Sequence, residues 1–204
     1  MQVHEFAKII LLGTSMDGKL LSPRSVTDWT RSDQPWRDVP HQPGRPEPLK
    51  FAASRSRSPL PSNRELAQEA TARGRLLHFF ANHELLAIEL MALALLRFPS
   101  APEAFQKGLL ATIEEEQAHL LLYQERMQAL GVGLGDVSVN GFFWECLKNM
   151  AEPLDFVVGM SLTFEQANLD HARFYRDLFG SIDDPETAQI LQKVYDDEIG
   201  HVKH

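Results

Sequence analysis

Two copies of one side-chain pattern constrain the fold of this 204-residue chain more than any other feature. Glu116 is followed three residues later by His119, and Glu198 is followed three residues later by His201. Because residues three apart lie on one face of an α-helix, each pair can direct a carboxylate and an imidazole to the same point. One such pair is a weak signal, since helices are rich in glutamate, but its repetition is informative.

A further glutamate precedes each pair at a nearly constant distance. Glu84 lies 32 residues before Glu116, and Glu165 lies 33 residues before Glu198, so both halves of the chain read as Glu followed by Glu-x-x-His. Helical bundles that bind two iron or manganese ions have this arrangement, with a glutamate from each of two helices and Glu-x-x-His from each of the other two. The repeat predicts an all-α fold, a ferritin-like four-helix bundle of two helical hairpins joined by a long crossover.

Hydrophobic patterning and helix-breaking residues give the bounds of the helices. Residues 85–96 are apolar nearly all round and are broken only by Glu89, which is typical of a buried bundle helix or a membrane span. Polar residues such as His78, Asn82 and His83 interrupt the longer run and favour the bundle helix. We expect long helices over residues 63–97, 102–130, 153–179 and 184–204, and short ones over residues 4–13 and, within the crossover, near residues 142–147.

The N-terminal part of the chain has a different composition. From about residue 22 to residue 61 it is rich in proline, serine and arginine and lacks a helical or strand period. Four apolar residues can still pin this segment to a partner surface: Trp29, Trp36, Leu49 and Phe51. We therefore divide the chain into residues 1–61, a short helix with an extended N-terminal arm, and residues 62–204, the bundle.

Charge is distributed unevenly around the net value of −8. Between Arg24 and Arg75 there are ten Lys or Arg against six Asp or Glu, whereas from residue 76 onward there are eight against twenty. An acidic domain is poorly matched to phosphate backbones, so nucleic acid is not expected as a partner. We interpret the basic segment as a solvated wrap that lies against the acidic domain.

Cysteine usage and the N-terminus indicate the compartment. The single cysteine, Cys146, excludes an internal disulfide framework and fits a reducing environment. The apolar run from Ile9 to Leu12 is too short for a signal peptide or a membrane span. These features predict a cytoplasmic protein without a membrane partner.

The residue types of the repeat suit a pair of metal ions. Four carboxylates can bridge two divalent cations, and two neutral imidazoles add one nitrogen ligand to each without adding charge. Such an oxygen-rich site suits iron(II), which we favour, or manganese(II), and four carboxylates in a bundle core would be intolerable without metal. The predicted ligands are Glu84, Glu116, His119, Glu165, Glu198 and His201.

The half-repeat, meaning the Glu followed by Glu-x-x-His that occurs in each half of the chain, leaves an alternative for one ligand. Glu84 and Glu165 are each followed five residues later by an acid, Glu89 and Asp170. Glu89 could replace Glu84 as the ligand, but it lies about 140° further round the helix, and the spacing of the half-repeat favours Glu84. Asp170 is expected near the site rather than as a ligand. Two further histidines are expected to be packed or hydrogen-bonded: His83 and His171.

Neighbours of the predicted ligands can support them. Metal-bound imidazoles usually donate their other N–H to a carboxylate. Asp197 and Glu115 each immediately precede a predicted glutamate ligand. We predict that Asp197 pairs with His119 and that Glu115 pairs with His201; the alternative is that both acids are solvated surface residues. Tyr123, four residues after His119, is either a hydrogen-bond donor to the site or a core tyrosine.

Most of the chain resembles a known family. The segments that carry the resemblance are HELLAIELMA (83–92), EEQAH (115–119), FEQANLDH (164–171), DEIGHV (197–202) and, in the arm, PGRP (43–46). They are similar to the bacterial ferritin-like proteins known as domain of unknown function 455. The resemblance implies a ferritin-like fold and a carboxylate-bridged dimetal site, and it assigns no reaction.

The end of the chain allows two interpretations. The chain stops at His204, three residues after His201 and without a helix-capping residue, so either the last helix ends there or it is truncated. The family that the chain resembles continues this helix, which favours truncation.

Our leading hypothesis is a dimetal oxidoreductase that activates dioxygen or peroxide beside an unknown small-molecule substrate. The alternatives are a non-catalytic metal-handling or ferroxidase protein, and a structural bundle with a vestigial site whose arm recruits a partner. A homodimer is compatible with each of these hypotheses.

Overall fold

The structure is a computed structural model that describes residues 1–30, 34–52, 59–160 and 166–201, except for the side chains of residues 167, 200 and 201. Within these residues all regular elements are helical, and β-structure is limited to two isolated bridges. The prediction of an all-α fold is confirmed.

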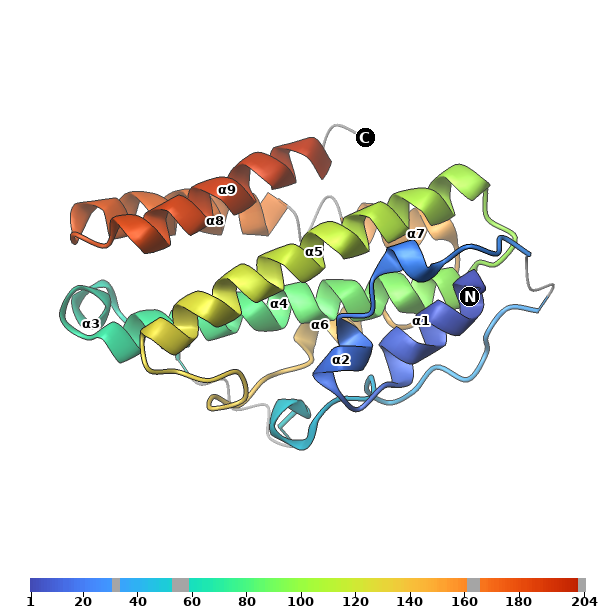
Figure 1. Ribbon diagram of the computed structural model, residues 1–204, viewed down its shortest axis with the longest axis horizontal. Helices are drawn as coiled ribbons and strands as arrows, with labels where there is room; N and C mark the ends of the chain where they lie inside the picture. Colours follow the sequence, from blue (N-terminus) through green and yellow to red (C-terminus); the bar gives the residue numbers. More distant parts are fainter. Residues whose placement is uncertain (31–33, 53–58, 161–165, 202–204) are drawn as a thin grey trace.

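A central antiparallel pair of helices, α4 (Ala70–Arg97) and α5 (Glu103–Ala129), forms the core of the molecule (Figure 1). The helix α4 is long and apolar enough to cross a membrane, but 94% of its most apolar stretch is buried inside the structure. A helix that is apolar on all sides must be covered on all sides. Here α5, α1 and α6 pack around it, so α4 is the core helix that the sequence predicts.

The predicted helix over residues 63–97 is divided in the structure. A short helix, α3 (Asn63–Gln68), begins at Ser62 with a capping box completed by Glu65. Glu69 then adopts an extended conformation, with φ of −126° and ψ of 118°, before α4 begins. The guanidinium of Arg73 donates to the carbonyl oxygen of Leu66 at 3.0 Å, which satisfies one of the carbonyls that the break leaves without an intrahelical partner.

A second antiparallel pair, α8 (Gln166–Ser181) and α9 (Pro185–His201), lies along one side of the central pair, and α9 packs against α5 (Figure 1). The predicted start of α9 is confirmed, because the Asp184 carboxylate accepts from the backbone N–H of Thr187 at 3.1 Å as an N-cap. The predicted third helix corresponds to α7 (Pro153–Gly159) and α8, and residues 161–165 between them lie outside the described residues.

The buried carboxylate of Asp184 also joins α9 to the central pair. Arg73 on α4 donates to one of its oxygens at 3.0 Å, and Arg126 on α5 donates to the other at 2.8 Å. Burial alone would raise the pKa of Asp184, but these hydrogen bonds and the Thr187 N–H hold the pKa below its ordinary value. One carboxylate therefore sets where α9 begins relative to α4 and α5.

The long connection between the two pairs contains the expected short helix, α6 (Phe142–Leu147). The indole N–H of its Trp144, which is fully buried, donates to the carbonyl oxygen of His41 in the arm at 2.9 Å. The turn that ends α5 uses Gly131, whose φ of +77° lies in the left-handed region favoured by glycine. The predicted glycine stop is therefore present.

The N-terminal part lies along the other side of the central pair from α8 and α9 (Figure 1). It comprises α1 (Val3–Leu12), which packs against α4, then α2 (Met16–Lys19) and the short 3₁₀ turns η1 (Pro23–Ser25) and η2 (Glu47–Leu49). Leu49 is buried, and Trp29 and Trp36 are partly buried against the core. The apolar residues of the arm therefore pin it to the bundle, as the sequence predicts.

A buried ion network anchors the arm to α4. The Arg45 guanidinium donates to Glu89 at 2.6 Å and to Asn82 at 2.9 Å, and the Lys19 ammonium lies 2.9 Å from the same Glu89 carboxylate. All three charged side chains are fully buried. The interpretation of the basic segment as a solvated wrap is wrong for Arg45, because the acid that it pairs with lies inside the core.

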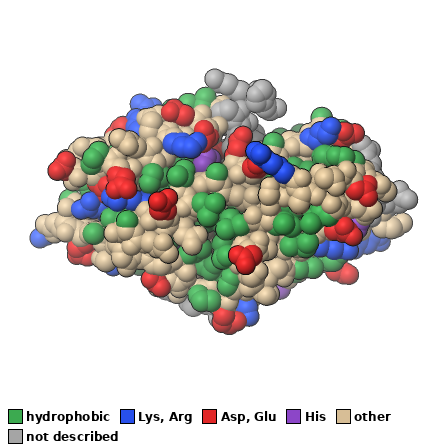
Figure 2. All heavy atoms as spheres, in the orientation of Figure 1, with side chains coloured by type: hydrophobic (Ala, Val, Ile, Leu, Met, Phe, Trp, Pro, Cys, Tyr) green, Lys and Arg blue, Asp and Glu red, His purple; other side chains and the backbone are tan. Residues whose placement is uncertain are grey.

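Surface charge on one face of the molecule is mixed. On the face shown in Figure 2, Lys and Arg side chains are interspersed with Asp and Glu side chains over the described residues. An exposed pair of this kind joins the arm to α5, where Arg24 donates to Glu114 at 2.6 Å. The description of a solvated wrap fits this pair.

The two ion pairs of the arm give a stability prediction. Arg45→Met leaves the buried Glu89 with one cation fewer, and we expect a loss of about 3–5 kcal/mol in the free energy of unfolding, together with earlier proteolytic cleavage in the arm. The matched control, Arg24→Met, removes an exposed pair and should change stability little. Urea denaturation of both variants tests this, and equal effects would contradict it.

Candidate metal centre

Four buried side chains from three helices converge at one point. They are Glu84 on α4, Glu116 and His119 on α5, and Glu198 on α9, and each offers a ligand atom within 4.8 Å of the others. Metal–oxygen bonds of about 2.0–2.2 Å place ligands on opposite sides of an ion about 4 Å apart. The spread of these atoms therefore matches the first shell of a metal ion.

Three features of the helices bring the four side chains together. Glu116 and His119 are one helical turn apart on α5, so they share a face of that helix. Glu84 faces them across the contact between α4 and α5. Glu198 reaches them because α9 packs antiparallel to α5 from its Asp184 anchor.

The carboxylates of the cluster repel one another. Burial, followed by the charges of Glu116 and Glu198, raises the pKa of Glu84 well above its ordinary range. One of its oxygens, Oε2, is buried without a hydrogen-bond partner among the described residues. A buried carboxylate whose nearest charged neighbours are other carboxylates indicates a cation that the polypeptide itself does not supply.

His119 connects the cluster to a more exposed acid. Its Nδ1 lies 3.2 Å from Glu116, and its Nε2 lies 3.0 Å from Asp197, which in turn accepts from Lys193 at 2.7 Å. Burial alone lowers the pKa of His119, but its contacts with Glu116 and Asp197 raise the pKa above the ordinary value. The predicted contact between Asp197 and His119 is present, and it leaves Nδ1 directed at the cluster.

These observations show how the donor set fits a metal ion. With Nε2–H donated to Asp197, Nδ1 of His119 becomes a neutral imidazole ligand, which is the usual support for a metal-bound histidine. Three carboxylates and one imidazole form an oxygen-rich set that suits iron(II) or manganese(II). A bound divalent cation would also reverse the repulsion that raises the pKa of Glu84.

Two predicted ligands cannot be compared with the structure. Glu165 lies outside the described residues, as does the side chain of His201. The pairing of Glu115 with His201 therefore stays a prediction; Glu115 itself is exposed on α5. Asp170 is exposed on α8 and is not part of the described cluster.

Glu84 rather than Glu89 joins the cluster. Glu89 is fully buried, but its carboxylate faces Arg45 and Lys19 on the opposite side of α4. The geometry therefore agrees with the choice that the half-repeat favours.

Tyr123 lies close to the cluster in the core. It is 2% exposed, and its ring packs 5.8 Å from that of Phe80. Burial, followed by the charges of Glu84, Glu198 and Glu116, raises the pKa of its phenol well above the ordinary value. The phenol therefore stays protonated beside the carboxylates, which is compatible with both roles that the sequence allows.

The two additional histidines pack among aromatic rings. His83 lies 4.1 Å from Phe79 and 4.7 Å from Phe143, measured between ring centroids, and His171 lies 6.4 Å from Tyr175. Burial lowers the pKa of His83 to about 3, so this imidazole is neutral. The structure places both as packed histidines, as expected.

Sequence reasoning missed the cations that neutralise Glu89. Lys19 and Arg45 are distant from Glu89 in the chain, and no local pattern marks them as buried. The signal that was available is Glu89 itself, the single acid within an apolar helical run, because an acid in such a position needs a partner.

The chain belongs to the DUF455 family, whose members are described as proteins of unknown function. The family's sequence model matches residues 14–204, which include the arm and all four clustered side chains. Neither a curated protein nor a solved structure matches the chain. Family membership thus establishes the relationship without assigning a reaction.

The repulsion within the cluster gives a pH prediction for the metal-free protein. A group whose pKa is raised by folding stabilises the fold below its unfolded pKa, and this stability is lost as the pH rises through the folded pKa. Glu84 and His119 are both raised. We therefore expect the stability contributed by the cluster to fall between about pH 5 and pH 8, so that the Tm of Glu84→Gln in chelator rises relative to that of the wild type over this range. The lowered pKa of His83 acts in the opposite direction in both proteins and cancels from this difference.

The lowered carboxylates do not interfere with this measurement. The pKa values of Asp184 and Asp197 are below their ordinary value, so their contributions are already complete above about pH 5. Thermal melts of the wild type and of Glu84→Gln across this range provide the test. An equal dependence of the Tm on pH in the two proteins would contradict the prediction.

Proposed function

We propose that this protein is a dimetal carboxylate oxidoreductase that activates dioxygen or peroxide beside an organic substrate. The proposed ligands are Glu84, Glu116, His119 and Glu198 from the cluster, with Glu165 and His201 from the sequence repeat. The proposed fold is the ferritin-like four-helix bundle, and the all-helical architecture with paired α4–α5 and α8–α9 supports it.

The observation that carries the proposal is the contrast between two buried glutamates on one helix. Glu89 has a guanidinium and an ammonium within 3 Å, and its charge is neutralised by the chain. Glu84, five residues earlier, has carboxylates and one imidazole as its neighbours. Burying an unneutralised carboxylate costs several kcal/mol. A resident divalent cation explains why this chain keeps the arrangement.

Iron or manganese at such a site would supply redox chemistry with dioxygen. The chain's own residues hold and orient the ligands. Asp197 accepts the Nε2–H of His119 and fixes the direction of Nδ1, and Lys193 holds Asp197 in place. The buried rings of Phe80 and Tyr123 exclude water from one side of the cluster.

An organic substrate is favoured by the surface that leads to the site. A groove of about 1090 Å³ runs between α5 and α7, and Asp197 lies at its edge. Apolar side chains such as Phe105, Phe156 and Met160 line one part of it, and the carboxylates of Glu114, Glu115 and Asp197 line another. The apolar part suits an organic molecule and supports an oxidoreductase, whereas the carboxylates suit the passage of iron in the alternative ferroxidase.

The compartment and the partners are part of the proposal. We propose a cytoplasmic protein, because its single cysteine fits a reducing environment. The proposed partner is a small-molecule substrate, and a homodimer is compatible with the site. A nucleic-acid partner is not proposed, since the net charge is −8.

The metal content of the protein tests this function. After anaerobic addition of iron(II), we expect about two irons per chain by elemental analysis, and a change in the visible spectrum on adding oxygen. Glu84→Gln should lose most of this iron, because it removes a buried anionic ligand. Glu114→Gln is the matched control, since Glu114 is on α5 but outside the cluster, and it should retain the metal.

Two outcomes would contradict the proposal. An absence of bound iron or manganese in the folded wild type would leave only the structural bundle with a vestigial site. Iron that is bound and oxidised, but released as a mineral without oxidation of any organic compound, would establish the ferroxidase alternative. Equal iron loss in Glu84→Gln and Glu114→Gln would show that the cluster is not the binding site.

Asp197 provides a second prediction for the site. Asp197→Asn removes the charge that holds the Nε2–H of His119, and we expect a metal affinity about 10–100-fold weaker with unchanged folding. Competition against a fluorescent chelator measures this affinity. The control is Asp196→Asn on the same turn of α9, whose carboxylate accepts from Gln192 rather than from His119. Equal affinities in the two variants would rule out this role of Asp197.

A further inference from the structure

A second cavity lies far from the carboxylate cluster. It has a volume of about 570 Å³ and forms where the arm, the end of α4, the start of α5 and the segment before α7 meet. This volume is within the range of small-molecule sites, about 300–1,000 Å³. Its Arg97 is 13 residues beyond Glu84 on α4, or about 20 Å along the helix. The cavity is therefore separate from the candidate metal centre.

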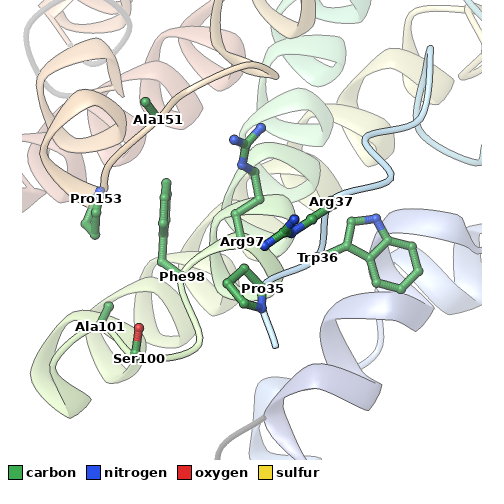
Figure 3. A pocket seen from close by; sticks show the side chains of 9 residues that line it. All are labelled: Pro35, Trp36, Arg37, Arg97, Phe98, Ser100, Ala101, Ala151 and Pro153. Atoms are coloured by element: carbon green, nitrogen blue, oxygen red, sulfur yellow. The ribbon is translucent and has the colours of Figure 1, made fainter. Parts of the chain in front are cut away.

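Two arginines give this cavity a positive character. Arg37 comes from the arm and Arg97 from the end of α4, and their side chains lie next to each other at the cavity, across from Phe98 (Figure 3). Among the described residues, no carboxylate-bearing residue lines the cavity and neither guanidinium forms an ion pair. By contrast, Arg45 and Arg126 each meet a carboxylate within 3 Å.

Two acids of the neighbouring wall, at the start of α7, are already engaged. Asp155 accepts from the backbone N–H groups of Ala151 and Glu152, each at 3.0 Å. The side chain of Glu152 in turn caps the start of α7. Both carboxylates are therefore used by the turn that precedes α7, and the arginines remain available to an external anion.

Arg97 is held by a hydrogen bond, and the backbone next to the exposed Arg37 is anchored to α4. One nitrogen of Arg97 donates to the carbonyl oxygen of Lys148 at 3.1 Å, which orients the guanidinium. The residue before Arg37, Trp36, donates its backbone N–H to the carbonyl oxygen of Leu96 at 2.9 Å and its indole N–H to the carbonyl oxygen of Asp38 at 2.6 Å. Lys8 lies 5.0 Å from the Trp36 ring and adds a third cation to this region. Arg97 therefore needs little reorganisation before a ligand binds, whereas the exposed Arg37 side chain is ordered by the ligand.

The rest of the lining is apolar. Pro35, Phe98 and Pro153 contribute to the uncharged wall, together with the hydroxyl-bearing Ser100 (Figure 3). Guanidinium groups bind the planar edge of carboxylates and phosphates through paired hydrogen bonds. A ligand that fits both features has an anionic end and a flat or apolar body.

We propose that this cavity, formed by Arg37, Arg97 and Phe98, binds a small organic anion whose carboxylate or phosphate group lies between the two guanidinium groups. The site is independent of the proposed metal chemistry. Its ligand is a substrate fragment or an effector that carries an aromatic or similarly apolar body.

Isothermal titration calorimetry at low ionic strength tests the site with defined probes: phenyl phosphate, benzoate, inorganic phosphate and the neutral benzyl alcohol. We expect phenyl phosphate or benzoate to bind more tightly than inorganic phosphate, which lacks the apolar body, and benzyl alcohol not to bind. Arg37→Gln and Arg97→Gln should each weaken binding at least about tenfold. The matched control, Arg64→Gln, alters an exposed arginine outside the cavity and should bind as the wild type does.

The relative affinities of the two organic probes identify the anionic group, since tighter benzoate indicates carboxylates and tighter phenyl phosphate indicates phosphate esters. Absence of binding for all probes at millimolar concentration would overturn the proposal. So would binding that Arg37→Gln and Arg97→Gln leave unchanged, or that Arg64→Gln weakens equally. If Arg97→Gln unfolds because it loses its bond to Lys148, Arg37→Gln still decides the outcome, as its side chain forms no hydrogen bond among the described residues.

Discussion

The cost of burying carboxylates on one helix governs how this protein is built. The core helix α4 carries Glu84 and Glu89 in a stretch that is otherwise almost entirely apolar and covered by other elements. Glu89 is accommodated because the N-terminal part of the chain folds back and inserts Lys19 and Arg45. Burial, with a smaller contribution from the charge of Arg45, lowers the pKa of Lys19 although the contact with Glu89 raises it. The N-terminal part of the chain therefore supplies the charges that neutralise a buried acid of the core.

The position of α9 depends on a separate set of charges. Asp184 binds arginines from both central helices at the point where α9 begins, and Arg126 also donates to Thr187 at 2.9 Å. From this anchor α9 runs antiparallel to α5, and about three and a half helical turns later Asp197 reaches His119. Glu198 follows directly and joins the cluster from the third helix. The Asp184 anchor at the start of α9 therefore determines which residues near the other end of α9 lie beside the candidate site.

The sequence predicts the parts of this structure that follow a helical spacing of apolar residues or a repeated motif. The helices follow from apolar spacing and breakers, and Glu84, Glu116, His119 and Glu198 follow from the repeat, since residues on one helical face share a site. The pairing of Asp197 with His119 follows from the chemistry of metal-bound imidazole. The break at Glu69 and the Arg45–Glu89 pair have no such signal, because they depend on residues brought together only by tertiary packing.

The two buried glutamates also explain how the arm can influence a site that it does not touch. Arg45 binds Glu89, Asn82 and the carbonyl oxygen of Leu49, so it holds one face of α4 at residues before and after Glu84. A fixed α4 cannot rotate to relieve the repulsion that Glu84 experiences from Glu116 and Glu198. Because the arm holds α4 in place, the repulsion among the carboxylates of the metal-free cluster persists. A divalent cation is the simplest species that can relieve this repulsion. In this arrangement the stability of the arm and the affinity of the candidate metal centre are linked through a single helix.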